Sequence, residues 1–132
     1  MDRLQIYLLI SHEWIARPQE YVPLPTHWAI FISPDIRAEG TLFNTLGAPF
    51  YGYTVDVRKN IRPVTSGGAG WLSLGLVHES KLERLEEIAK STPEPVGKCR
   101  VWAKWFVERL VDEGVLHEVA LQTFEAAPKK ML

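Results

Sequence analysis

The side chains with the greatest capacity for chemistry in this chain are one cysteine and four histidines. Cys99 lies in "EPVGKCRVWAKWF" (94–106), where a Pro/Gly-rich stretch gives way to an amphipathic run. A helix that begins near Lys98 places the cysteine in its first turn, where unpaired backbone N–H groups and the helix dipole favour a thiolate. Lys98 and Arg100 add positive potential on either side. Two interpretations stay open: a small packed residue, as free cysteines usually are, or an activated thiol.

The four histidines are the candidate bases for such a thiol. His27 is the most distinctive, because "THWAIFI" (26–32) places one imidazole at the mouth of an otherwise apolar segment. We expect His12 and His78 at strand ends and His117 at the surface. The cysteine and the histidines lack zinc-site spacings such as Cys-x-x-Cys or His-Glu-x-x-His, so no metal is expected.

Composition bounds the class of protein. A chain of 132 residues fits a single domain over 1–132, and 46% hydrophobic with 23% charged residues is ordinary for a globular protein. Fifteen basic and sixteen acidic residues give a net charge of -1, which argues against nucleic acid as a partner. The first fourteen residues lack a basic n-region and a small-residue cleavage site. We therefore expect a soluble cytoplasmic protein with no signal peptide and no membrane span.

The elements that must position these residues follow from hydrophobic patterning. The segment 26–33 is nearly all apolar, which predicts a central strand covered on both faces. The elements expected along the chain are strands over 4–14, 26–33, 41–47, 48–60 and 71–79, loops over 16–25 and 61–70, helices over 80–91 and 98–113, a short strand over 115–125, and a frayed tail over 126–132. Together they predict an α+β domain in which a largely antiparallel sheet of about five strands is followed by two helices.

Both helices carry sequence signals at their ends. In "SKLERLEEIAKS" (80–91), Ser80 is the predicted N-cap and Glu83 completes a capping box. The second helix is expected to end before Gly114, a favourable residue just after a helix. The predicted buried stripes are Leu82, Leu85, Ile88 and Ala89 in the first helix, and Trp102, Trp105, Phe106 and Leu110 in the second.

Two short segments carry a resemblance to a known superfamily. "HWAIFI" (27–32) followed later by "KCRVWAKWF" (98–106) resembles the circularly permuted papain-like proteins, which include permuted NlpC-like hydrolases and the lecithin:retinol acyltransferase-like family. In that arrangement the histidine comes first, on a strand, and the nucleophilic cysteine comes later, at the start of a helix. The resemblance covers about 26–113 and implies a permuted papain-like fold. The whole chain is also similar to small fungal proteins with this histidine strand and cysteine helix.

The resemblance implies a role for each site residue. Cys99 would be the nucleophile and His27 its acid/base partner. The third polar residue of the family lies on the strand after the histidine strand, where this chain has Asn44 in "GTLFNTLGAPF". Asparagine replaces the more usual histidine, and its amide oxygen can accept the other ring N–H of the imidazole. Lys98 stands where the acyltransferase-like relatives often have asparagine.

The expected function is that of a cysteine-dependent hydrolase or acyltransferase, without a cofactor, on a small, partly apolar ester, thioester or amide. A hydrophobic substrate wall is expected near the site, with plain core packing as its alternative; it comprises Trp28, Phe50, Tyr51 and Trp71, with Lys98 as a further substrate contact. "TSGGAG" (65–70) lacks the Gly-Lys-Ser/Thr of a phosphate loop and reads as a lid or linker.

Two other functions remain open. One is a cyclase or isomerase of a small molecule that uses His27 as acid/base and does not need the thiol. The other is a non-catalytic binding module, for which five tryptophans leave an aromatic binding surface or a homodimer contact as possibilities.

Overall fold

The computed structural model describes residues 3–11, 14–17, 20–23, 27–35, 38–48, 52–61, 70–93 and 99–126. Within these ranges it describes only the backbone of 11, 14–17, 20–23, 27, 46–48, 52–54, 70–71 and 99–100. The elements are β1 (Arg3–Ser11), β2 (Trp14–Arg17), β3 (Glu20–Pro23), β4 (His27–Ser33), β5 (Gly40–Ala48), β6 (Gly52–Ile61), β7 (Gly70–His78), the 3₁₀ turn η1 (Glu79–Lys81), α1 (Leu82–Ser91), α2 (Cys99–Asp112) and α3 (Val119–Glu125).

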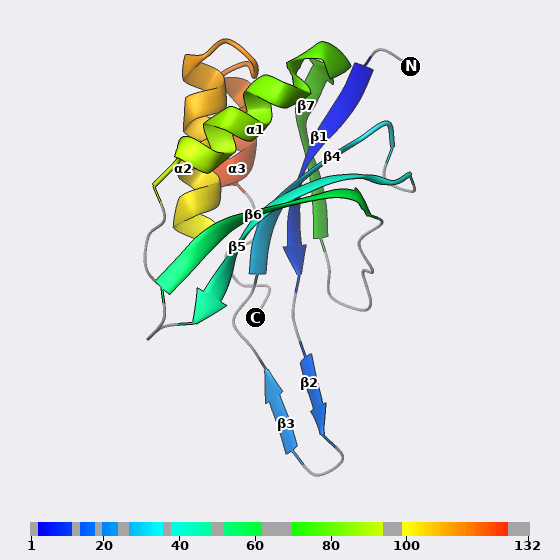
Figure 1. The fold of residues 1–132 in the computed structure, drawn as a ribbon, viewed down its shortest axis with the longest axis vertical. Coiled ribbons are helices and arrows are strands. Elements are labelled where there is room, and N and C mark those ends of the chain that lie inside the picture. Colours follow the sequence, from blue (N-terminus) through cyan, green and yellow to red (C-terminus); the bar gives the residue numbers. More distant parts are fainter. Residues whose placement is uncertain are drawn as a thin grey trace.

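Five strands form one antiparallel sheet in the order β6-β5-β4-β1-β7 (Figure 1). The N-terminal strand therefore lies inside the sheet, between β4 and β7. The predicted α+β class with a five-stranded antiparallel sheet is confirmed. The described ranges contain three α-helices rather than the predicted two, because a third helix follows α2.

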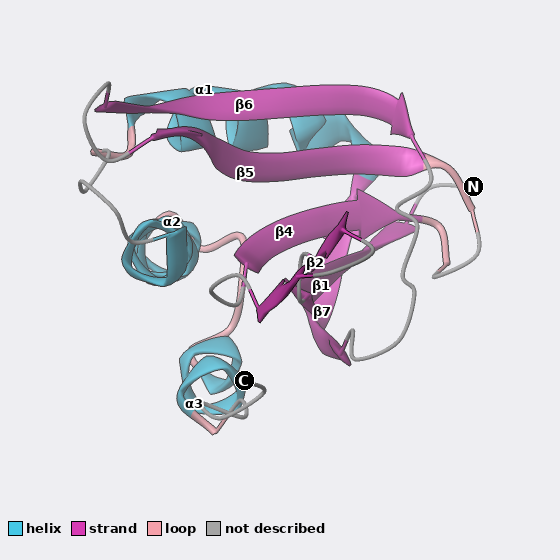
Figure 2. Ribbon diagram, turned by 90° about the horizontal axis from the view of Figure 1, so that it is seen from below, coloured by secondary structure: helices cyan, strands magenta, loops and turns pink. Residues whose placement is uncertain are grey.

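The three helices pack against one face of the sheet (Figures 1 and 2). Alternate residues of the central strands, such as Ile30 and Ile32, point into this core. The intervening residues Ala29 and Phe31 are also almost fully buried. The prediction that this strand is central and covered on both faces is thus confirmed.

Helix α2 is the main helix of the core. The rings of Trp102 and Phe106 lie 5.2 Å apart between centroids, and Phe106 lies 5.4 Å from Phe43 of β5. The prediction that Trp105 belongs to the buried stripe is wrong, since its side chain is 38% exposed. Ala103 and other small or branched residues fill the helix face beside Trp102 instead. The predicted span of 98–113 agrees with α2 to within one residue at each end.

Helix α1 begins differently from the prediction. A 3₁₀ turn precedes it, the side chain of His78 caps that turn, and Lys81 at the N-cap of α1 makes no side-chain capping bond. The Ser80 hydroxyl lies 2.8 Å from His78 Nδ1, so the predicted capping box with Glu83 is wrong. In the predicted stripe of α1, Leu85, Ile88 and Ala89 are fully buried and Leu82 only partly so.

Two further predictions are corrected by the structure. The segment 16–25 was expected to be a loop, but Trp14–Arg17 and Glu20–Pro23 pair as an antiparallel hairpin. Pro23 is tolerated there because it ends its strand. The segment 115–125 was expected to be a strand, but Val119–Glu125 is helical and buries Ala120 and Phe124, four residues apart on one face. Residues 62–69 of the expected loop and 127–132 of the expected tail lie outside the described residues.

Candidate functional site

The candidate site lies where a helix and a strand both begin. Cys99 is the first residue of α2, and His27 is the first residue of β4. Both ribbon views show these two ends side by side at the same end of the sheet (Figures 1 and 2). The proximity has a packing cause, because α2 lies across β4 and β5 through its apolar face. The structure thus brings together the backbone starts of the two elements that carry the predicted cysteine and histidine.

His27 lies at one end of the pairing between β1 and β4. Its Cα is opposite Ser11, the last residue of β1. The chain upstream of it forms the β2–β3 hairpin, which Figure 1 shows extending beyond the sheet. The side chains of His27 and Cys99 lie outside the described residues, so the site is defined by the backbone at these two positions.

Asn44 is the described polar side chain of the predicted triad. It is 5% exposed, and its Oδ1 atom is buried without a hydrogen-bond partner. Its neighbour Phe43 faces α2, so strand alternation puts Asn44 on the opposite face of the sheet. Phe43 is paired with Ile30 of β4, which puts Asn44 across from Ala29. An unpaired buried carbonyl is costly, by about 1–3 kcal/mol, which marks this oxygen as an acceptor available for another donor.

The residues of the predicted substrate wall are only partly described. Trp28 is 4% exposed and lies against Phe124 of α3, with ring centroids 5.3 Å apart, so it contributes to the core between β4 and α3. The backbone of Trp71 lies in β7, opposite Leu9 of β1. Phe50, Tyr51 and Lys98 lie outside the described residues.

One feature near the site was not predicted. Trp102, one turn after Cys99, is fully buried and its Nε1 atom has no hydrogen-bond partner. The helical spacing correctly predicted that Trp102 is buried, but spacing alone says nothing about the partner of the indole N–H. Buried tryptophan N–H groups usually find an acceptor, so this donor is a second unsatisfied group close to the start of α2.

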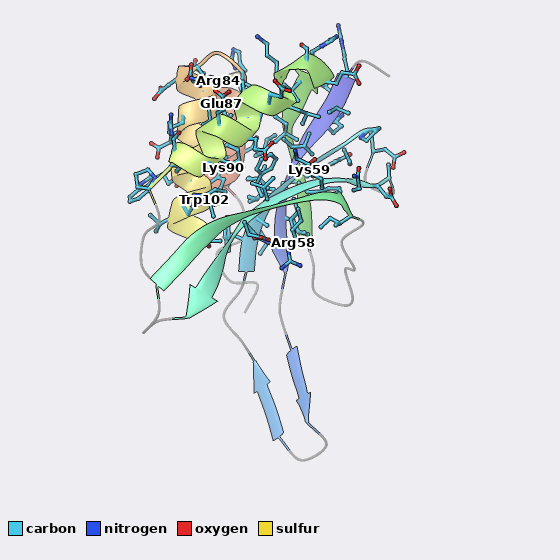
Figure 3. All side chains as sticks on the ribbon, in the orientation of Figure 1. Arg58, Lys59, Arg84, Glu87, Lys90 and Trp102 are labelled. Atoms are coloured by element: carbon cyan, nitrogen blue, oxygen red, sulfur yellow. The ribbon has the colours of Figure 1, made fainter. Side chains whose placement is uncertain are left out.

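A separate cavity of about 230 Å³ lies between β5, β6 and α1. At its rim, the Glu86 carboxylate pairs with the Lys90 ammonium at 3.1 Å and with the Lys59 ammonium at 3.2 Å. Figure 3 labels the two lysines. The hydrogen bonds from Lys90 and Lys59 lower the pKa of the Glu86 carboxyl. The Lys59–Glu86 pair joins α1 to the edge strand β6. The lining residues are Thr41, Phe43, Lys59, Asn60, Leu82, Glu83 and Glu86.

Within the described ranges, no cluster of histidine, cysteine and carboxylate side chains could hold a metal ion. No described helix has the length and apolar character needed to cross a membrane.

The fold and the candidate site define an α+β protein in which a helix that starts at a cysteine packs across an antiparallel sheet beside the start of a histidine strand. The chain belongs to the DUF6540 family, described as a family of unknown function, whose model matches residues 14–117. The matched segment contains Cys99, His27 and Asn44. No curated protein and no solved structure matches the chain.

Proposed function

We propose that this protein is a cysteine-dependent hydrolase or acyltransferase acting on a small, partly apolar ester, thioester or amide. The observation that carries the proposal is that α2 begins at Cys99 beside the beginning of β4 at His27. A thiol in the first turn of a helix of 14 residues is favoured as a thiolate by unpaired N–H groups and the helix dipole. A neighbouring imidazole is the usual proton partner of such a thiol.

The proposed reaction has two stages. The Cys99 thiolate attacks the carbonyl carbon, the carbonyl π electrons move onto oxygen, and an S–C bond forms. The leaving group takes the proton of the His27 imidazolium as its bond to carbon breaks. Water or another acceptor then gives a proton back to His27 and attacks the thioester carbonyl; the S–C bond breaks, and the Cys99 thiolate and the His27 imidazolium are restored. Backbone N–H groups at the start of α2 would stabilise each oxyanion, by roughly 3 kcal/mol per donor in comparable sites.

Asn44 would act on the imidazole rather than on the substrate. Its Oδ1 atom is buried and lacks a donor, and it lies on the sheet face away from α2. The two nitrogens of an imidazole lie on different edges of the ring, so one can face a thiol while the other faces an amide oxygen. The amide would then select the tautomer whose other nitrogen faces the thiol. The resemblance to permuted papain-like proteins supports the same order of roles.

The reactivity of the thiol tests the proposal directly, because Cys99 is the only cysteine in the chain and any thiol label reports on it alone. We expect iodoacetamide to label the protein faster at pH 7 than it labels a short cysteine peptide. The labelling rate should rise with a midpoint below roughly 8.5, the pKa of an ordinary cysteine. His27→Ala should shift this midpoint upward. Labelling at or below the peptide rate, with an ordinary midpoint, would exclude an activated nucleophile.

Activity assays on a panel of small esters, thioesters and amides then separate the alternatives. Cys99→Ala and Cys99→Ser should abolish turnover under the proposal. Turnover that survives in Cys99→Ala but is lost in His27→Ala would instead indicate a cyclase or isomerase that uses only the imidazole. Unreactive thiol and no turnover in the wild-type protein would indicate a binding module.

A further inference from the structure

Two of the four histidines hold the start of a helical segment in the same way. The Nδ1 atom of His78 accepts the backbone N–H of Ser80 at 3.1 Å at the start of η1. The Nδ1 atom of His117 accepts the backbone N–H of Val119 at 3.1 Å at the start of α3. A backbone N–H can only donate, so each ring must present an unprotonated Nδ1. Both caps therefore exist only with the neutral imidazole.

We expect the cap to matter most for α3, which is short and whose start is otherwise held by the backbone bonds of Ala120 and Leu121 and by the burial of Ala120. This helix has seven residues, and Glu118 at its N-cap makes no side-chain capping bond. A helix this short is marginal without its packing and its caps. Protonation of His117 would put a hydrogen on Nδ1, remove the acceptor for Val119, and place a positive charge at the helix end whose dipole is also positive.

We propose that α3 is an acid-sensitive clasp, in which protonation of His117 weakens the start of α3 and loosens the contact between Phe124 and Trp28. Phe124 is buried and its ring lies 5.3 Å from that of Trp28. Trp28 directly follows His27, so the contact that α3 makes through Phe124 is with the second residue of β4. The inference is a property of the fold and does not depend on thiol chemistry.

The charged groups near the cap do not offset this effect through any described contact. On α3 itself, Glu125 pairs with Lys104 of α2 at the far end of the helix. At the end of α2, Glu113 is held by Arg84 of α1, and Asp112 precedes it. The end of β7, which packs against α3, carries His78, with Arg3 of β1 directly opposite. Glu118 follows His117 in sequence, yet no ion pair between a carboxylate and His117 occurs among the described residues.

Hydrogen exchange of the full chain at pH 7.5 and pH 5.5, corrected for intrinsic exchange rates, tests the clasp. Amides of α3 should lose protection roughly fivefold at the lower pH, the scale of one lost cap, relative to amides of α2 in the same sample. His117→Asn keeps a capping side chain that does not titrate, so it should abolish this pH dependence and retain protection. His117→Ala should lower protection equally at both pH values.

His78→Asn is the matched control, because it alters the same kind of cap on another segment. It should leave the pH response of α3 unchanged. The inference is overturned if wild-type α3 shows equal protection at both pH values. It is also overturned if His117→Asn keeps the wild-type pH response.

Discussion

At the scale of single residues, Asn44 combines burial with an unmet need for a hydrogen bond. Its Oδ1 atom is buried without a partner, although the side chain is in the middle of a well-paired strand. A residue kept only for stability would avoid this cost, since an apolar side chain of similar size suits the site better. The amide is therefore a candidate for a group retained for function at the expense of stability.

Replacement of Asn44 should separate these two properties. We expect Asn44→Val to raise the free energy of unfolding by about 1 kcal/mol, because it removes an unsatisfied polar group and favours a strand. The same change should slow iodoacetamide labelling of Cys99 by shifting its pH midpoint upward. Urea unfolding and labelling rates measured on the same preparation check both expectations. A variant that is destabilised and labels normally would assign Asn44 a purely structural role.

Gly40 is required for a different reason, namely close approach of the backbone. A Cβ atom at this position would lie 2.2 Å from the carbonyl oxygen of Ile32 and 2.9 Å from the ring of Phe31. Gly40→Ala should therefore lower the free energy of unfolding by about 1–3 kcal/mol, because backbone and ring must both move. Thermal or urea unfolding measures the loss.

Gly114 is the matched control for Gly40. It has a φ of +76°, and a Cβ atom there would meet nothing within 4 Å. Gly114→Ala should cost only about 1 kcal/mol, from backbone conformation alone. Equal losses in the two variants would contradict the view that contact, rather than conformation, makes Gly40 necessary.

At the scale of elements, one arginine joins the ends of two helices. Arg109 of α2 donates from Nη1 to the Ile88 carbonyl oxygen at 3.2 Å and to the Ser91 hydroxyl at 2.6 Å. These groups lie in the last turn of α1, where carbonyls lack helical partners and a cation is favourable. The contact therefore caps α1 and fixes its end against α2.

Removal of the arginine should cost its charge-assisted bonds, although the Ile88 carbonyl keeps the hydroxyl donors of Ser91 and Thr92. We expect Arg109→Met to lower the free energy of unfolding by about 1 kcal/mol and to speed hydrogen exchange at the end of α1. Lys90→Met serves as the control, since Lys90 makes an exposed i,i+4 ion pair with Glu86. That change should stay within about 0.5 kcal/mol. Similar losses in both variants would show that Arg109 acts only as a surface charge.

The element scale also shows what sequence patterns can and cannot specify. Period and composition correctly predicted β4 and α2, including a helix start within one residue of Cys99. They failed for α3, because "VLHEVALQTFE" contains strand-forming residues and its helical stripe has only two fully buried members. The predicted capping box failed because His78 Nδ1 accepts the Ser80 backbone N–H that the Glu83 side chain would have accepted.

The candidate site could be predicted only in part. The resemblance to permuted papain-like proteins, rather than the residue pattern, predicted that a cysteine helix and a histidine strand would meet. In the structure, α2 and β4 begin at the same end of the sheet, and the meeting of the two side chains stays a prediction. The face on which Asn44 lies depends on how β5 pairs with β4 and β6, and pairing register is not encoded in one strand alone. Its burial and unsatisfied oxygen therefore required the folded structure.

At the scale of the whole molecule, the sheet has an edge at β6. Arg58 and Lys59 are exposed on this strand, and Arg58 pairs with Asp56 on the same face at 2.7 Å (Figure 3). Charged side chains on an edge strand oppose pairing with a second chain. They offer a reason for this edge to stay unpaired with other molecules.

Neutralising the edge should therefore promote self-association. We expect the double variant Arg58→Thr, Lys59→Thr to form dimers or larger species as concentration rises, measured by sedimentation velocity against wild type. A variant with Lys81→Thr and Lys90→Thr, which removes equal charge from η1 and α1, should behave as wild type. Association in both variants would point to net charge rather than the β6 edge.

The interior position of β1 has a consequence for the time course of synthesis. Arg3 pairs with His78, so β1 completes its second ladder only after β7 has been made. Its partner on the other side, β4, is available much earlier. During translation, β1 must therefore wait with one side open to solvent or to chaperones until β7 emerges, and these long-range contacts favour slow folding. β7, the last strand of this sheet along the chain, is thus the one that pairs with β1, the first of the five.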